Sequence, residues 1–312
     1  MFYLGLDIGG TKCAASVGST DNGGVQILKR AEVPTVSDPA RTLDRLDGAV
    51  SEYLAKYPIS RAGISCGGPL DSAAGVILNP PNLPGWENFR IAEYVSERYG
   101  ISARLENDAN ACAVAEWKYG AGAGYSNVVF MTFGTGLGAG LILDGRLYSG
   151  VGGNAGEAGH IRLARTGPVG FGKRGSFEGF CSGGGIARLA IEMAKKERVM
   201  PECIEKMGGY EAVTTKELSK YAFAGDSFAL RVFRRSGKML GRGLSIIIDL
   251  LNPEVIVLGG VFMRASELLI PSMRAEIKKE ALADSARLCK ILPAKLSENV
   301  GDIAAISVAA ME

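Results

Sequence analysis

Two glycine-rich turns constrain this chain most, one in each half of the sequence. Near the start, an apolar run reaches Asp7 and breaks into Gly9-Gly10-Thr11-Lys12 before a second apolar run begins. Past residue 125, another apolar run passes through Gly134-Thr135-Gly136-Leu137-Gly138 into its successor. Glycine permits a tight bend and close approach of a ligand, and the free N–H groups of such a turn form an anion-binding concavity. The two turns together predict that the two halves of the chain bind one polyphosphate, as in nucleotide-dependent phosphoryl transfer.

Other interpretations of these turns fit less well. A single glycine hairpin with no ligand is common, but two such turns carrying Asp, Thr and Lys favour a binding role. Gly134, Gly136 and Ala139 match the spacing of a dinucleotide fingerprint, which requires a helix directly after the turn. Here the turn leads to Asp144-Gly145 between apolar runs, which is a hairpin signal. A Walker-type phosphate loop is absent from the sequence.

Composition excludes several classes of function. The 312 residues are 47% hydrophobic and 22% charged, which fits one large or two ordinary globular domains. A formal net charge of +2 without a large basic cluster argues against nucleic acid as a partner, and no apolar run reaches the ~18 residues of a membrane span. The start of the chain shows no secretion signal and the six cysteines are scattered singly, so we expect reduced thiols in a cytoplasmic protein.

Periodicity and turn signals predict a mixed α/β chain. The expected strands are 2–8, 13–18, 25–28, 62–66, 103–105, 128–133, 141–143, 146–148, 255–258 and 289–293. The expected helices are one that begins at residue 39, then 91–99, 109–119, 183–197, 214–223, 226–250, 267–281 and 302–311. We expect two α/β domains, 1–116 and 117–299, with a C-terminal helix within 300–312 that packs back on the first domain.

Two polar positions are candidates for chemistry. Asp108 stands between a predicted strand and a predicted helix, where a carboxylate would be held rigidly enough to act as a base toward an acceptor hydroxyl. The competing interpretation is an ordinary helix N-cap. His160, the one histidine of the chain, follows Glu157 in a glycine-rich segment. This pair suits the vicinal hydroxyls of a sugar, although a structural histidine is the alternative.

Six motifs occur in order over nearly the whole chain: Asp7-Ile-Gly-Gly-Thr-Lys12, Gly67-Gly-Pro-Leu-Asp71, Glu106-Asn-Asp-Ala-Asn110, Gly134-Thr-Gly-Leu-Gly138, Gly156-Glu-Ala-Gly-His160 and Pro253…Leu258-Gly-Gly-Val261. In this combination they resemble the ROK family (repressors, ORFs and kinases). The resemblance implies a two-domain α/β fold of the actin-like ATPase (ribonuclease H-like) type, with a central cleft that closes on ATP and a sugar. It also implies a homodimer.

The resemblance implies a role for each matching residue. Asp108 would be the general base, and Asp7 would lie near the Mg²⁺ that accompanies ATP. The residues implied for ATP and its phosphates are Asp7, Gly9, Gly10, Thr11, Lys12, Gly134, Thr135, Gly136, Gly138, Gly259 and Gly260. The residues implied for the sugar are Gly68, Asn82, Asn107, Asp108, Glu157, His160 and Glu178.

One segment departs from the family pattern. Many members follow the Gly-His pair with a Cys-rich segment that binds structural zinc together with the histidine. Here residues 165–181 contain a single cysteine, Cys181, and Glu178 alone preserves the end of the motif. We therefore expect no structural zinc.

These features predict an ATP-dependent kinase that phosphorylates a hexose, most simply at the 6-hydroxyl. Glucose, fructose, mannose and N-acetylhexosamines all remain open as substrates. The alternative is a non-catalytic, sugar-sensing regulator of the same family, because the family also contains repressors. We expect no nucleic acid and no membrane as partners of this chain.

Overall fold

The computed structural model describes residues 1–21, 23–296 and 300–311. The chain forms two compact units. The first unit contains Met1–Phe130, Gly140–Ala155 and Lys295–Glu312, and the second contains Met131–Ala139 and Gly156–Ala294. The expected domain boundary at residue 116 stays a prediction.

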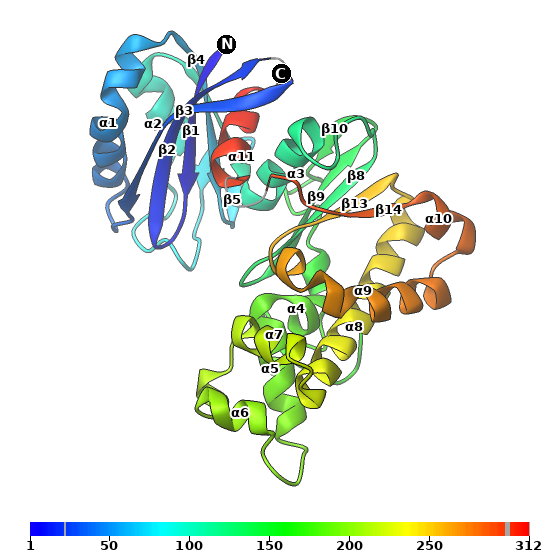
Figure 1. Ribbon diagram of the computed structural model, residues 1–312. Helices are drawn as coiled ribbons and strands as arrows, with labels where there is room; N and C mark the ends of the chain where they lie inside the picture. Colours follow the sequence, from blue (N-terminus) through cyan, green and yellow to red (C-terminus); the bar gives the residue numbers. More distant parts are fainter. Residues whose placement is uncertain (22, 297–299, 312) are drawn as a thin grey trace. The chain divides into compact units, whose positions relative to one another are not determined.

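The first unit is built on a five-stranded sheet with the order β3-β2-β1-β4-β7 (Figure 1). β1, β2 and β3 form an antiparallel meander, whereas β4 and β7 continue from β1 in parallel. β3 extends well beyond the expected 25–28, because it pairs with β2 along the length of that strand. The strands are β1 (Phe2–Ile8), β2 (Lys12–Asp21), β3 (Gly24–Pro34), β4 (Ile59–Cys66) and β7 (Ser102–Asn107), with a small separate hairpin of β5 (Leu70–Asp71) and β6 (Val76–Ile77).

Helices cover both faces of this sheet. α1 (Pro39–Lys56) begins at the N-cap Asp38 and buries Leu43, Leu46 and Val50, the apolar stripe that its helical spacing predicts. α2 (Ile91–Tyr99) contributes Ile91 and Val95 to the same core. On the other side, α11 (Val300–Ala309) contacts β1, β4 and α3 (Asp108–Tyr119). α11 comes so close that a Cβ at Gly63 of β4 would lie 2.1 Å from the carbonyl oxygen of Ala305.

A second five-stranded sheet has the order β10-β9-β8-β13-β14. Its strands are β8 (Val128–Phe133), β9 (Leu137–Leu143), β10 (Arg146–Tyr148), β13 (Val255–Leu258) and β14 (Lys290–Pro293). The predicted hairpin between β9 and β10 is confirmed, since Leu143 pairs with Arg146 and the two turn residues, Asp144 and Gly145, have φ of 50° and 70°.

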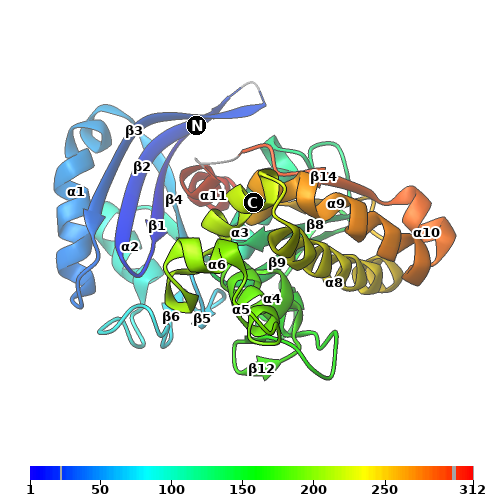
Figure 2. The same cartoon turned by 60° about the horizontal axis from the view of Figure 1, so that its bottom comes forward.

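The second unit holds most of the helices. They are α4 (Phe177–Cys181), α5 (Gly183–Ala194), α6 (Glu202–Met207), α7 (Thr215–Phe223), α8 (Ser227–Leu251), α9 (Val261–Glu280) and α10 (Ala283–Leu288). The two longest, α8 and α9, lie side by side (Figure 2). α9 begins six residues before the expected helix 267–281 because a first helical segment joins it across a kink at Ala265. Among the described residues, no helix combines the length and the apolar character needed to cross a membrane.

Candidate active site

The carboxyl ends of three parallel strands of the first unit lie at one edge of its sheet. Asp7 of β1 is in register with Ser65 of β4, and Cys66 of β4 is in register with Asn107 of β7. The segments that leave these strands therefore start from the same edge. They are the first glycine turn, the Gly67-Gly68 pair and the start of α3 with Asp108. In α/β proteins, ligands bind outside the carboxyl ends of such strands.

The first glycine turn is fixed by hydrogen bonds and by close packing. The Thr35 hydroxyl donates to the Gly9 carbonyl oxygen (2.6 Å), and the Thr35 backbone N–H donates to the Thr11 carbonyl oxygen (3.0 Å). A Cβ at Gly10 would lie 2.4 Å from the backbone oxygen of Asn82, so this position requires glycine. The structure thus brings Asn82 against the first glycine turn, and Thr35 is a supporting residue that the sequence did not reveal.

Asp7 carries a perturbed carboxyl group. The pKa of Asp7 is raised from 3.8 to about 6, mainly by burial and also by the negative charges of Asp302 and Asp108, against lowering contributions from Arg30 and Lys12. Burial removes solvation from the carboxylate, so a cation bound there would relieve the cost of its charge. Mg²⁺ takes one or two carboxylates together with phosphate oxygens. The donor set of this unit therefore fits a nucleotide-bound magnesium.

Asp302 is a second buried acidic group that sequence patterns did not identify. The Ser16 hydroxyl donates to its Oδ1 (2.6 Å), and Arg30 Nε donates to its Oδ2 (2.8 Å). Arg30 also pairs with Glu32 at 2.7 Å, and Glu32 accepts from Lys12 Nζ at 2.9 Å. The amine of Lys12, expected at a phosphate, therefore lies in an exposed pair with a carboxylate in this structure.

Asp108 is the first residue of α3, and the N-cap is its neighbour. Asn107 Oδ1 accepts from the Ala109 backbone N–H (3.0 Å), while Asp108 Oδ1 accepts from the same N–H at 2.8 Å. The Asp108 residue is exposed. Its Oδ2 lies 4.0 Å from the position of a Cβ at Gly67, and a Cβ at Gly68 would lie 3.5 Å from Asn107 Nδ2. The glycine pair thus keeps the space beside both side chains open.

Glu106 fixes the junction between β7 and α3. The residue is buried, and its Oε1 accepts from the Ser72 hydroxyl (3.1 Å), the Asn107 backbone N–H (2.9 Å) and Asn110 Nδ2 (3.0 Å). This network fixes the end of β7 and the first turn of α3 relative to each other. The sequence motif contained Glu106 and Asn110, but nothing in it distinguished their supporting role from that of Asp108.

In the second unit, three glycine segments converge. The Gly259 N–H donates to the Met131 carbonyl oxygen (2.9 Å), and the Gly183 N–H donates to the Gly134 carbonyl oxygen (2.9 Å). Gly260 has a φ of 60°, and a Cβ there would lie 2.2 Å from the carbonyl oxygen of Phe133. The second glycine turn, the Gly259-Gly260 turn and the start of α5 are therefore neighbours. The run of glycines from Gly183 was a visible signal for this third segment.

Glu178 links the second glycine turn to the segment that contains His160. Glu178 Oε2 accepts from the Leu137 backbone N–H (3.1 Å) and lies 2.9 Å from the position of a Cβ at Gly136. A Cβ at Gly159 would lie 2.2 Å from the Leu137 carbonyl oxygen and 3.4 Å from the Glu178 Cβ. One oxygen of this carboxylate therefore holds the turn in place.

The other two polar residues of this region lie around a short 3₁₀ turn, Ala158–His160. Glu157 is exposed, and the His160 and Phe171 rings pack in a T-shaped arrangement with their centres 5.0 Å apart. The Cys181 thiol is buried and donates to the Ser236 carbonyl oxygen (3.6 Å), and burial raises its pKa. Within the described part of the chain, no group of three or more His, Cys, Asp or Glu side chains is placed to hold a metal ion.

The predicted site residues thus fall into two sets. The first unit holds Asp7, Gly9, Gly10, Thr11, Lys12, Gly68, Asn82, Asn107 and Asp108. The second unit holds Gly134, Thr135, Gly136, Gly138, Glu157, His160, Glu178, Gly259 and Gly260.

Comparison with known proteins finds relatives that match nearly the whole chain. The chain is 31% identical over 310 residues to a glucokinase of Streptomyces coelicolor, covering 98% of this chain and 96% of that protein. It is 25% identical over 304 residues to a xylose repressor of Bacillus spizizenii, covering 96% and 74%. Among solved structures, a ROK family glucokinase from Streptomyces griseus in complex with glucose and AMPPNP matches with a TM-score of 0.78 and 31% identity, over 99% of both chains.

The predicted α/β fold of the actin-like type is confirmed by these structural matches. The model of the ROK family matches residues 3–312. That match covers all six motifs and nearly the whole length of the chain. The protein is a member of the ROK family.

Proposed function

We propose that this protein is an ATP-dependent hexose kinase that transfers the γ-phosphoryl group to a sugar hydroxyl, most simply the 6-hydroxyl. The observation that carries the proposal is the shared sheet edge of the first unit, where Asp7 lies at the carboxyl end of β1 and Asp108 directly follows β7, close enough for the charge of Asp108 to raise the pKa of Asp7. The resemblance to glucokinases adds support.

Asp108 is the proposed base. It is exposed beside the Gly67-Gly68 pair, and its backbone is fixed at the first turn of α3 by the Glu106 network. Its carboxylate would accept the proton of the sugar hydroxyl as that oxygen attacks the γ-phosphorus and the bond to the β-phosphate oxygen breaks. A positioned base contributes ~10²–10⁴-fold to such a rate. Asn107 and Asn82 would orient the other sugar hydroxyls.

The second unit would complete sugar and nucleotide binding. Glu157 and His160 would bond sugar hydroxyls, and Glu178 would hold the glycine turn through Leu137 with one oxygen while the other faces the sugar. The backbone N–H groups of the two glycine turns would bind the phosphates, and Gly259-Gly260 would lie against the adenosine. Phosphoryl transfer depends mainly on such positioning and charge stabilisation.

Asp7 would hold the Mg²⁺ of the nucleotide. The metal supplies charge neutralisation at the phosphate oxygens when it is bound. Asp7 can serve this role only as a carboxylate. Because its pKa is raised to about 6, we expect the affinity for Mg-ATP to decline as the pH falls through 6.

A sugar-sensing regulator is the second candidate, and the match to a xylose repressor favours it. A regulator of that kind requires sugar binding but no base. The exposed carboxylate of Asp108, beside a glycine pair that keeps the adjacent space open, favours a kinase.

A sugar-dependent ADP-release assay separates these functions. The protein would be incubated with Mg-ATP and, in turn, glucose, fructose, mannose, N-acetylglucosamine and N-acetylmannosamine, and ADP would be measured by a coupled enzyme assay. A kinase should release ADP with at least one hexose, well above the rate without sugar. Sugar binding by calorimetry without ADP release from any of them would favour the regulator.

A further inference from the structure

A basic pocket in the second unit lies outside the residues assigned to the proposed reaction. It encloses about 500 Å³, which is within the range of small-molecule sites. Its lining comes from α4, α5, α8 and the turn at Thr166-Gly167, and includes the apolar side chains of Phe180, Leu189 and Met193. The lining residues are Thr166, Gly167, Phe180, Leu189, Glu192, Met193, Lys196, Arg231, Arg234, Arg235 and Lys238. We call this the α5–α8 pocket.

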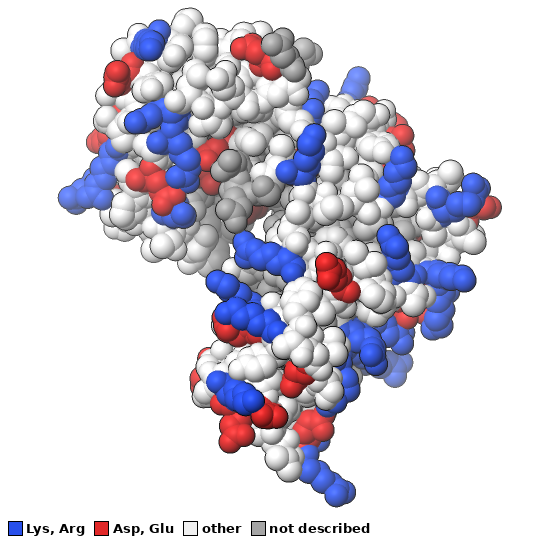
Figure 3. All heavy atoms as spheres, in the orientation of Figure 1, with Lys and Arg blue, Asp and Glu red and all other residues white. Residues whose placement is uncertain are grey.

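Five of these residues are basic and only one is acidic. Figure 3 shows the result on the surface, where Lys and Arg side chains gather along α8, below α9. Such a concentration of like charge in a concave site disfavours the empty pocket through self-repulsion. It attracts anions for the same reason.

The carboxylates near the pocket neutralise only part of this charge. Arg231 pairs with Glu197 at 2.6 Å. Lys238 lies 3.7 Å from Glu276, a carboxylate that Arg242 already binds at 2.6 Å. Lys238 therefore shares its counter-charge with a second cation.

The other three cations have no acidic partner among the residues that the structure describes. Lys196 and Arg234 form no ion pair there, and the Arg235 guanidinium lies over the Phe180 ring, 5.9 Å from its centre. The one carboxylate of the lining, Glu192, lies 3.9 Å from Arg174. The lining thus offers three uncompensated cations.

The spacing of the cations indicates the size of the anion. Arg231, Arg234, Arg235 and Lys238 follow one face of α8 at intervals of three, one and three residues. With a rise of 1.5 Å per residue, the face from 231 to 238 extends ~10 Å along the helix. A single phosphate group would reach only part of this row, whereas linked phosphates would contact several cations at once. Arg is well suited to bind phosphate oxygens through paired N–H groups.

We propose that the α5–α8 pocket binds a small polyanion that carries two or more phosphate groups. The ligand would be held by Lys196, Arg234 and Arg235, with Arg231 and Lys238 at the ends of the row. None of the lining residues is among those assigned above to ATP or sugar. The proposal therefore stands whether or not the chain is a kinase.

The test is titration calorimetry of the full chain with sodium tripolyphosphate, inorganic phosphate and ATP. The pocket variant is Lys196→Gln/Arg234→Gln/Arg235→Gln, which changes three exposed side chains. A control with the same loss of charge is Arg45→Gln/Arg274→Gln/Lys278→Gln, at exposed positions of α1 and α9. Tripolyphosphate can also bind at the glycine turns. Only a binding event that the pocket variant loses is therefore assigned to the α5–α8 pocket.

We expect the pocket variant to bind tripolyphosphate at least tenfold more weakly at this event, and the control to match the wild type. Inorganic phosphate should bind the wild type at least tenfold more weakly than tripolyphosphate, and added salt should weaken binding. If ATP reproduces the event, the ligand class is a nucleotide; if only tripolyphosphate does, it is a free polyphosphate.

Three results would overturn the proposal. One is equal tripolyphosphate affinity in the wild type and the pocket variant. The second is an equal loss in the control, which would indicate a diffuse effect of net charge. The third is a wild-type dimer, seen by analytical ultracentrifugation, that the pocket variant dissociates, because a second copy would then cover this face. The single variant Arg234→Gln, expected to weaken binding about threefold, keeps the test valid if the triple variant does not fold.

Discussion

Replacing Gly301 with alanine should lower kinase activity without unfolding the protein. Gly301 lies in the first turn of α11, and a Cβ there would lie 2.5 Å from Oδ2 and 3.3 Å from Cγ of Asp7. Real Cβ contacts are essentially never shorter than 3.0 Å, so the Asp7 carboxylate must shift by about 0.5 Å or more. The substitution therefore displaces the proposed magnesium ligand without changing its chemistry.

The effect on folding should be small because two contributions oppose each other. Alanine is favoured over glycine in a helix by up to ~1 kcal/mol. The added methyl group costs ~1–3 kcal/mol if its neighbours must move. The free energy of unfolding should therefore fall by no more than about 3 kcal/mol. Activity should fall further, since misplacing a reacting group by about 1 Å can cost ~10²-fold. We expect about a tenfold lower kcat, with a higher Mg²⁺ requirement.

Gly48→Ala is the matched control. Gly48 lies inside α1, where a Cβ would meet no atom within 4 Å. This variant should gain up to ~1 kcal/mol in unfolding free energy and keep wild-type kinetics. The assays are urea denaturation and steady-state kinetics over a range of Mg²⁺ concentrations. A folded Gly301→Ala variant with unchanged kcat and Mg²⁺ dependence would refute the placement of Asp7 at the metal.

Three further predictions concern two carboxylates and the metal requirement. Asp7→Asn should stabilise the metal-free protein at pH 7 by up to about 3 kcal/mol. The folded pKa of Asp7 (about 6) exceeds the unfolded value of 3.8, so the stability of the wild type falls as the pH rises from 4 to 6. Denaturation of both proteins at pH 4 and pH 7 checks this, and a variant less stable than the wild type at pH 7 would contradict it. Glu178→Ala removes the acceptor of the Leu137 N–H and should lower the unfolding free energy by ~1.5–3 kcal/mol. Glu178→Gln keeps an acceptor and should lower the unfolding free energy less. An equal decrease in both variants would count against this hydrogen bond. The protein should keep its activity after chelation and resupply of Mg²⁺ alone, and stoichiometric zinc by elemental analysis would show that the segment around His160 was misinterpreted.

Local patterns predicted the elements and the glycine turns well. The apolar stripe of α1, the Asp144-Gly145 hairpin and the position of Asp108 at a strand–helix junction all depend on residues close in the sequence. The parallel register that sets Asp7 and Asn107 at one sheet edge follows from the strands but required the structure to establish.

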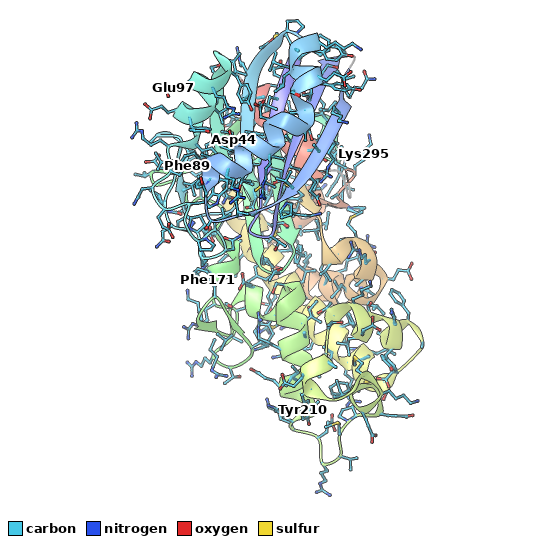
Figure 4. All side chains as sticks on the ribbon, turned by 90° about the vertical axis from the view of Figure 1, so that its left-hand side faces the viewer. Asp44, Phe89, Glu97, Phe171, Tyr210 and Lys295 are labelled. Atoms are coloured by element: carbon cyan, nitrogen blue, oxygen red, sulfur yellow. The ribbon has the colours of Figure 1, made fainter. Side chains whose placement is uncertain are left out.

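Residues that act across long sequence separations could not be predicted in this way. Asp302 reaches Ser16 and Arg30 only because α11 returns to the first sheet. Glu116 is fully buried, and its carboxylate accepts from the backbone N–H groups of Lys295 (labelled in Figure 4) and Leu296, in a segment nearly 180 residues away. A buried carboxylate on an apolar helix gives no local signal of its partner. The four basic residues of α8 that line the pocket were not singled out from the sequence, because the pocket forms only where α5 packs beside α8.

The central claim is that Asp108 takes the proton of a sugar hydroxyl during phosphoryl transfer. The most direct test is single-turnover transfer from ATP to the best hexose, followed by ³¹P NMR, in the wild type, in Asp108→Asn and in Asp284→Asn, an exposed carboxylate of α10 that serves as a control. Sugar affinity is measured in parallel by calorimetry. We predict that Asp108→Asn slows transfer by ~10²–10⁴-fold while its sugar affinity stays within a few-fold of the wild type, and that the control is unchanged. Transfer by Asp108→Asn at nearly the wild-type rate would contradict the account.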